Sequence, residues 1–190
     1  MSLGNFLFRW RGELAVPFVA AAVALAQPVG PTFAAGLAVT VAGELIRIAA
    51  LRHIGPKSRR TARSSSHTVV RSGPYGWTRN PLYLGNFVMT AGLLVAANRP
   101  LLLAAGVVAV FAHYWLIIGA EESALSKQFG DDYQRYLGEV PRLLPLPPKR
   151  RAGGPAPYGF GEIILPEMNT IVTFELAFVL VGAVGIWKLS

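Results

Sequence analysis

Residues 67 to 85 read HTVVRSGPYGWTRNPLYLG, and they gather chemically useful side chains between two long apolar stretches. Arginine binds anions, while histidine and tyrosine donate and accept hydrogen bonds. A second polar group, Glu121 and Glu122, follows a later apolar stretch. The C-terminal end of a helix is already partly negative, so two adjacent carboxylates there need a cationic partner. We expect Arg71, Arg79 or a cationic ligand to provide it.

Each of these residues taken singly also fits a structural role. Asn80 before Pro81 is typical of a turn that leads into a helix. Tyr75 and Tyr83 are typical of aromatic side chains at a membrane interface. The hypothesis of a functional site therefore rests on the combination of both polar segments.

The composition indicates a membrane protein without metal or thiol chemistry. Of the 190 residues, 53% are hydrophobic and 15% are charged, whereas soluble domains carry about 25% charged residues. There is no cysteine, and the three histidines form no His-x-x-x-His pair, so we expect no metal site. The net charge of +8 is concentrated beside apolar segments. This placement favours anionic lipid headgroups as partners and argues against nucleic acid.

Five apolar segments predict an all-α, polytopic integral membrane protein with about five transmembrane helices, since a span needs about 20 apolar residues. The segments are residues 14–26, 31–51, 82–98, 100–118 and 169–187. The first segment is short, contains Pro17 and follows two arginines, so a cleaved signal peptide is the alternative to the retained helix that we expect. The short turn between the third and fourth segments predicts an antiparallel hairpin.

The basic residues predict the orientation in the membrane. Five spans place the N-terminus, the loop 52–81 and the segment 119–168 on one side. Of the 18 basic residues, only Arg99 and Lys188 fall on the other side, and Arg47 lies within a span. The positive-inside rule then makes the first side cytoplasmic. Both polar segments therefore lie on the cytoplasmic face, where they can close over one site.

The segment 121–145 predicts two short amphipathic helices that lie against the membrane or cover the loop. Apolar side chains recur every four residues at Leu125, Phe129, Tyr133 and Leu137. Gly130 and Asp131 predict a helix stop followed by an N-cap. Prolines then break the helix, and residues 146–160 form a basic linker before the last span. We treat residues 1–190 as one domain.

The ordered pattern of both segments carries a resemblance to a known family. The stretches HTVV, GPY, RNPLYLG, EE, FGDDYQRY and VPRLLP follow one another between His67 and Pro145. In this order and spacing, the chain resembles the integral membrane methyltransferases typified by isoprenylcysteine carboxyl methyltransferase and the phospholipid N-methyltransferases. It departs from them at Asn80, where many members carry histidine, so we assign position 80 no acid–base role.

The resemblance implies S-adenosylmethionine as the methyl donor, bound on the cytoplasmic side, and a lipophilic acceptor that enters from the bilayer. Arg79 and Glu122 are the implied catalytic residues. The implied donor-binding residues are His67, Val69, Val70, Gly73, Pro74, Tyr75, Arg79, Asn80, Pro81, Tyr83, Glu121 and Glu122. The glutamates would receive the donor's ammonium or ribose hydroxyls, and Arg79 would pair with its carboxylate. The backbone at Val69 and Val70 would lie close to the adenine.

The acceptor stays open between a carboxylate, an amine and a thiol. A carboxylate such as that of a prenylcysteine needs no base, and Arg71 or Arg79 could orient it. An amine needs a base, and Glu122 could take the proton. Glu44 and Arg47 lie three residues apart within a span, so they either line the acceptor site or form a structural pair.

Two other interpretations compete with a methyltransferase. A steroid-reductase-like membrane oxidoreductase would need a nicotinamide site, and the chain has no G-x-G-x-x-G fingerprint. A non-catalytic transporter or scaffold should show internal repeats and broken helices, and we find no convincing repeat. Glu167 and Glu175 lie outside the resemblance, and their role is open between oligomer contacts and the acceptor pocket.

Overall fold

The computed structural model describes residues 16–55, 68–147 and 156–189. All regular secondary structure in these ranges is helical, which confirms the all-α class. The helices are α2 (Val16–Leu25), α3 (Gly30–Ile54), the 3-10 helix η3 (Gly73–Gly76), α4 (Pro81–Ala96), α5 (Pro100–Phe129), α6 (Asp131–Glu139) and α7 (Phe160–Leu189).

Among the described helices, three, namely α3, α5 and α7, are long and apolar enough to cross a bilayer, as expected of an integral membrane protein. The helices α2 and α4 are also apolar but have only 10 and 16 residues. A helix rises ~1.5 Å per residue, so α4 covers about 24 Å of a hydrocarbon core of about 30 Å. The five expected apolar helices are therefore present, while a count of five membrane spans stays a prediction.

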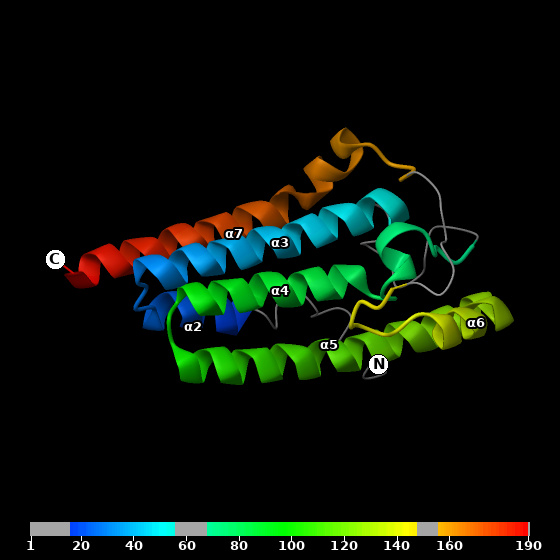
Figure 1. The fold of residues 1–190 in the computed structure, drawn as a ribbon, viewed down its shortest axis with the longest axis horizontal. Helices are drawn as coiled ribbons and strands as arrows, with labels where there is room; N and C mark the ends of the chain where they lie inside the picture. The colour runs from blue at the N-terminus through cyan, green and yellow to red at the C-terminus, as the bar shows by residue number, and fades with distance from the viewer. Residues whose placement is uncertain (1–15, 56–67, 148–155, 190) are drawn as a thin grey trace.

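The long helices lie side by side, and η3 and α6 lie at one end of them, where α6 follows α5 and η3 precedes α4 (Figure 1). The opposite end is closed by bonds between two turns. The amide of Gln27 donates to Ala97 O at 2.9 Å, and Asn98 Nδ2 donates to Gln27 O at 3.0 Å. Arg99 Nε donates to Leu25 O at 2.7 Å. The α4–α5 hairpin is thus tied to the turn that precedes α3.

Glycines let α3 and α4 pack with their backbones in contact. Gly36 and Gly43 of α3 lie against Gly92 and Gly85 of α4, in antiparallel order. A Cβ on Gly43 would lie only 2.8 Å from the carbonyl oxygen of Gly85. Between the two glycine pairs, Thr40 Oγ1 donates to a backbone carbonyl of α4 at 3.1 Å. Small residues of this kind are typical of closely packed membrane helices.

The helix α5 continues past residue 118, the predicted end of its span, to Phe129. Glutamate is a good helix former, so the carboxylates that follow the apolar stretch do not end the helix. Gly130 ends it with φ of 54°, which confirms the predicted stop. The predicted N-cap is wrong by one position, because Gly130 is the N-cap and Asp131 is the first residue of α6. The two predicted amphipathic helices are the end of α5 and α6.

The helix α7 begins at Phe160, ahead of the span start predicted at residue 169. Pro166 lies inside α7, and a proline removes one hydrogen bond from a helix and bends it. Figure 1 shows the first turns of α7 angled away from the rest of the helix. Ile163 and Glu167 are fully buried on either side of the proline, and this packing explains why the helix extends through it.

We expect Gly92→Ala to destabilise the protein, because the added Cβ would meet the backbone of α3. Overpacking costs about 1–3 kcal/mol, which lowers the thermal unfolding midpoint of the detergent-solubilised protein. Gly119→Ala is the matched control, since a Cβ at Gly119 meets nothing within 4 Å and alanine is the better helix former. Equal midpoints for the two variants would contradict the close helix contact.

Candidate active site

The loop that precedes α4 is held by the chain that follows α6. The amide of Arg79 donates to Pro141 O at 2.9 Å. Thr78 Oγ1 and Asn80 Nδ2 both donate to Arg142 O, at 3.2 and 2.9 Å. The two polar segments, which the α4–α5 hairpin separates in the sequence, therefore lie together at the polar end of the bundle.

The helix α6 lies against the same loop. Tyr136 Oη donates to Tyr75 O at 2.7 Å, and Arg79 Nη1 donates to Leu137 O at 2.6 Å. The rings of Tyr133 and Tyr136 are tilted against each other with centroids 5.8 Å apart. These contacts bring three tyrosines and one arginine to the junction of α6 and the loop.

The three tyrosines at this junction keep their hydroxyl protons. Burial raises the pKa of Tyr75, Tyr133 and Tyr136 well above the usual value for a phenol. The negative charge of Glu122 raises the pKa of Tyr133 further. All three hydroxyls are therefore neutral at physiological pH and remain hydrogen-bond donors.

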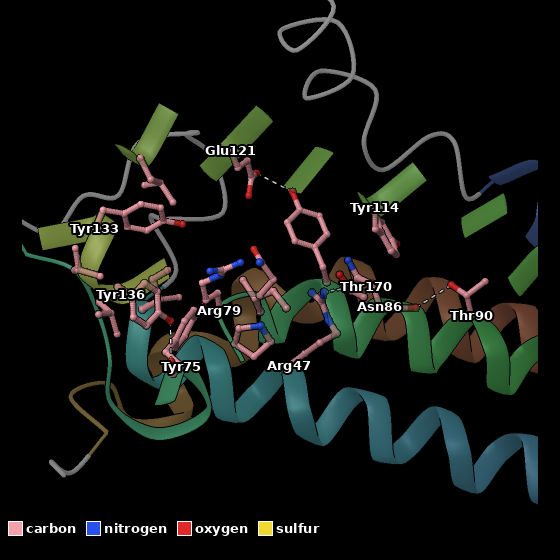
Figure 2. Close-up of a pocket in the computed structure, with 18 of the residues that line it drawn as sticks. Arg47, Tyr75, Arg79, Asn86, Thr90, Tyr114, Glu121, Tyr133, Tyr136 and Thr170 are labelled. Atoms are coloured by element: carbon pink, nitrogen blue, oxygen red, sulfur yellow. Dashed lines mark hydrogen bonds between the residues drawn. The ribbon is translucent and has the colours of Figure 1, made fainter. Parts of the chain in front are cut away.

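A cavity of about 560 Å³ lies between the loop and the helices (Figure 2), within the range of ~300–1,000 Å³ typical of ligand sites. The polar and charged side chains that line it are Arg47, Thr68, Tyr75, Arg79, Asn80, Tyr83, Asn86, Thr90, Tyr114, Glu121, Tyr133, Tyr136, Asn169, Thr170 and Thr173. The other lining residues are Val16, Val19, Ile54, Val69, Val70, Pro81, Leu82, Leu125, Phe129 and Phe174.

The two ends of the cavity are formed by different structural elements. Its outer end is formed by the loop, α6 and the end of α5, and comprises Val69, Val70, Tyr75, Glu121, Tyr133 and Tyr136. Its inner end lies among the long helices and comprises Asn86, Thr90, Tyr114, Thr170 and Thr173. Figure 2 shows the tyrosines of α6 and η3 together on one side and Tyr114 and Thr90 on the other, with Arg79 and Arg47 between them.

Glu121 and Glu122 lie about two turns before the end of α5 at Phe129, and the two adjacent carboxylates have different surroundings. Glu121 lines the cavity and accepts a hydrogen bond from Tyr83 Oη at 2.7 Å. Glu122 lies outside the cavity lining, and its side chain is 7% exposed. Its two oxygens pair with Arg79 Nε at 3.0 Å and with Arg142 Nη2 at 2.6 Å. Arg79, one of the two expected cationic partners, is therefore present, and Arg142 is a second that the sequence did not indicate.

Arg71, the other expected partner of these carboxylates, binds elsewhere. Its guanidinium pairs with Asp132 at 2.7 Å and with Glu139 at 3.4 Å, both on α6. It lies 5.6 Å from the centre of the Tyr136 ring and does not line the cavity. Arg71 therefore fastens α6 to the loop from outside the cavity.

Arg47 of α3 connects three helices beside the cavity. Its Nε donates to Glu167 Oε1 of α7 at 2.7 Å, and its Nη1 donates to Asn86 Oδ1 of α4. The expected pairing with Glu44 is also present, at 3.7 Å. A Cβ at Gly85 would collide with the side chain of Arg47, so glycine at this position leaves the path that the arginine takes to α4.

Most of the predicted donor-site residues line the cavity: Val69, Val70, Tyr75, Arg79, Asn80, Pro81, Tyr83 and Glu121. Gly73, Pro74 and Glu122 lie outside the lining, and His67 falls outside the described residues. Gly73 has φ of 57°, and a Cβ at this position would collide with the His53 ring. Glycine is therefore favoured here both by the backbone conformation and by the lack of space for a side chain. Of the predicted acceptor residues, Arg47 lines the cavity, whereas Glu44 and Arg71 do not.

Sequence reasoning missed the polar residues of the inner end. Asn86 and Thr90 lie within an apolar helix, and Thr170 and Thr173 lie in the last one. A polar side chain inside a membrane helix is a functional signal in its own right, and this signal was available at Asn86. Tyr133 was predicted as part of a helical face, and the structure adds that this face lines the cavity.

The amino-acid sequence of this chain is similar to those of known proteins. Residues 31–132, more than half of the chain, match the sequence model of a family described as phospholipid methyltransferase. A protein-S-isoprenylcysteine O-methyltransferase of Xenopus laevis is 34% identical over 114 residues, which cover 58% of this chain and 40% of that protein. The proteins of the same name from Homo sapiens and Saccharomyces cerevisiae are 33% and 28% identical over 114 residues, covering 40% and 48% of their lengths. The chain thus matches less than half the length of these relatives. No solved structure matches it.

We expect Glu122→Gln to lower the thermal unfolding midpoint much more than Glu121→Gln, in detergent and without ligand. Removing the Glu122 charge leaves Arg79 and Arg142 facing each other without a carboxylate. Breaking a buried ion pair costs about 3–5 kcal/mol, and we expect the lower part of this range because the Arg142 side chain is 28% exposed. In Glu121→Gln, the amide oxygen of the glutamine can still accept the hydrogen bond from Tyr83 Oη. Equal unfolding midpoints for the two variants would contradict the conclusion that Glu122, and not Glu121, holds the fold together through its ion pairs.

Proposed function

The chain belongs to the phospholipid methyltransferase family, and on this premise we propose that it transfers a methyl group from S-adenosylmethionine to the carboxylate of a lipophilic, prenylcysteine-type acceptor. The relatives named protein-S-isoprenylcysteine O-methyltransferase support a carboxylate on a prenylcysteine. The observation that carries the proposal is one continuous cavity with an outer end of polar segments and an inner end among apolar helices. Such a cavity can bring a water-soluble donor to a membrane-bound acceptor.

The outer end offers groups that fit the donor. S-adenosylmethionine carries an ammonium and a sulfonium, and Glu121 supplies a carboxylate to a cation. The ring faces of Tyr75 and Tyr133 also attract cations. Arg79 would pair with the donor's carboxylate, with its guanidinium held by Glu122. The backbone at Val69 and Val70 would contact the adenine.

The proposed chemistry needs no general base. S-adenosylmethionine supplies a methyl group on a cationic sulfur, so that the new O–CH₃ bond forms as the C–S bond breaks and its electron pair stays on sulfur. A carboxylate acceptor releases no proton. Glu122 therefore serves as a positioning residue for Arg79, in place of the proton acceptor that an amine would require. The protein aligns the two reactants, and apolar residues such as Leu125 and Phe129 exclude water from between them.

We place the outer end on the cytoplasmic face and treat the chain as one domain. The 3-10 helix η3, the start of α4 and α6 lie at a single end of the bundle (Figure 1). Among the described loops, Arg71, Arg79 and Arg142 lie at that end, and Arg99 lies in the turn at the other. The positive-inside rule supports this orientation. The donor would then enter from the cytosol and the acceptor from the bilayer.

We expect labelled S-adenosylmethionine to bind the detergent-purified protein saturably. Glu121→Gln should weaken this binding about 10-fold, the usual effect of losing one hydrogen bond to a charged group. Asp131→Asn is the control, because Asp131 is an exposed carboxylate outside the cavity lining. No saturable binding to the unaltered protein would overturn the donor assignment, and equal weakening in both variants would overturn the role of Glu121.

The identity of the methylated atom is tested by the stability of the product. With N-acetyl-S-farnesylcysteine as acceptor, we expect labelled methyl to enter a product that alkali hydrolyses to methanol, since a carboxyl methyl ester is base-labile. A methylated amine or thioether withstands the same treatment. A labelled product that resists alkali would therefore exclude the carboxylate as the acceptor group.

A further inference from the structure

The inner end of the cavity is more polar than a hydrocarbon chain requires. The helix α4 contributes Asn86 and Thr90, and α7 contributes Thr170 and Thr173. Thr90 lies about 13 Å along the axis from the start of α4, at ~1.5 Å per residue. An isoprenoid tail makes no hydrogen bonds, and burying polar groups against it costs free energy. Thr90 Oγ1 and Thr173 Oγ1 already donate to backbone carbonyls of their own helices, at 2.9 and 2.6 Å. The polar contact that this end can offer to an acceptor therefore comes chiefly from Arg47 and Asn86.

Arg47 lies between the two ends of the cavity (Figure 2), and its guanidinium is held by hydrogen bonds to α4 and to α7. Its side chain is 5% exposed. Nε and Nη2 donate to Glu167 Oε1, and Nη1 donates to Asn86 Oδ1. A guanidinium has five N–H groups, so these bonds to described residues use three of them. Because Arg47 also lines the cavity, the other two can donate to a bound acceptor.

The charges around Arg47 determine what kind of group it can bind. Glu167 is fully buried against it, and Glu44 lies 3.7 Å from its Nε. Counted over these three described residues, one ionised carboxylate neutralises the guanidinium, and two make the net charge of the cluster negative. A second anion would therefore gain nothing from the cluster's net charge, whereas an uncharged oxygen can still accept hydrogen bonds from the cationic donor.

We propose that Arg47 and Asn86 form a subsite for an uncharged oxygen of the acceptor, such as the amide carbonyl next to the methylated carboxylate. Glu167 is the positioning residue that holds Arg47 in this subsite. The subsite rests on the proposed function and deepens it, because it selects among acceptors with the same carboxylate. Glu167 belongs to α7, which lies beyond the residues 31–132 that match the family.

Two acceptors that differ in this one group test the subsite. N-acetyl-S-farnesylcysteine carries the amide, and S-farnesylthiopropionic acid has the same lipid and carboxylate without it. In the unaltered protein, we expect KM to be about 10-fold lower for the acceptor with the amide, as for a hydrogen bond to a charged donor. Glu167→Gln should abolish this preference by raising that KM about 10-fold. It should leave kcat, the KM of the amide-free acid and the Kd of labelled donor within about twofold.

Two further variants and one further measurement support this test. Glu175→Gln is the matched control, since Glu175 lies on α7 outside the cavity lining, and we expect no change in any of these constants. If Glu167→Gln does not fold, Asn86→Ala on α4 replaces it in the comparison of the two acceptors. We expect this variant to raise the KM of the acceptor with the amide about 3-fold. Heat stabilisation of the protein by each lipid, measured without donor, reports acceptor binding independently of methyl transfer.

The outcomes separate the subsite from the proposed function. Equal KM changes for both acceptors, in Glu167→Gln and in Asn86→Ala, would overturn the subsite and leave the methyltransferase assignment intact. Stronger heat stabilisation by the lipid with the amide, lost in Glu167→Gln, would support the subsite even if no methyl ester formed. The absence of methyl ester with both acceptors would overturn the proposed acceptor class instead.

Discussion

The close contact of α3 with α4 is the constraint on which the cavity depends. Four glycines bring the two backbones together, and Gly85 also leaves the path along which Arg47 reaches α4. Arg47 can bond to Asn86 and Glu167 only because α3, α4 and α7 meet at this distance. The loop with Arg79 leads directly into α4. A change in the helix contact would therefore move the outer and the inner end of the cavity together.

At the outer end of the cavity, Glu122 joins two segments that are far apart in the chain. Arg79 comes from the loop before α4 and Arg142 from the chain after α6, and both pair with this one carboxylate. Two arginines and one glutamate leave one positive charge, which the neighbouring Glu121 balances at the cavity wall. The backbone bond from Arg79 to Pro141 adds a link that does not depend on charge.

The sequence predicted the outer end better than the inner one, for physical reasons. The loop residues follow one another in the chain, so their proximity needs no tertiary information. Successive helical residues point about 100° apart, so only one of Glu121 and Glu122 faces the cavity, and the sequence does not say which. Arg47 and Glu167 are 120 positions apart, and no local pattern reports such a pair. The apolar span predicted at residues 169–187 lies within α7, and the turns from Phe160 that precede it are helical because packing at Ile163 and Glu167 holds the helix together through Pro166.

The position of α7 after α3 in the chain has a consequence for biosynthesis. Arg47 enters the membrane with α3, long before Glu167 is synthesised, and a lone arginine in lipid is costly. Glu44 lies one helical turn away on the same helix, 3.7 Å from Arg47, and so accompanies it during insertion. The helix α3 therefore carries its own counter-charge through the translocation machinery. Glu167 completes the pairing when α7 arrives, and the same helix then adds Asn169, Thr170, Thr173 and Phe174 to the lining of the cavity.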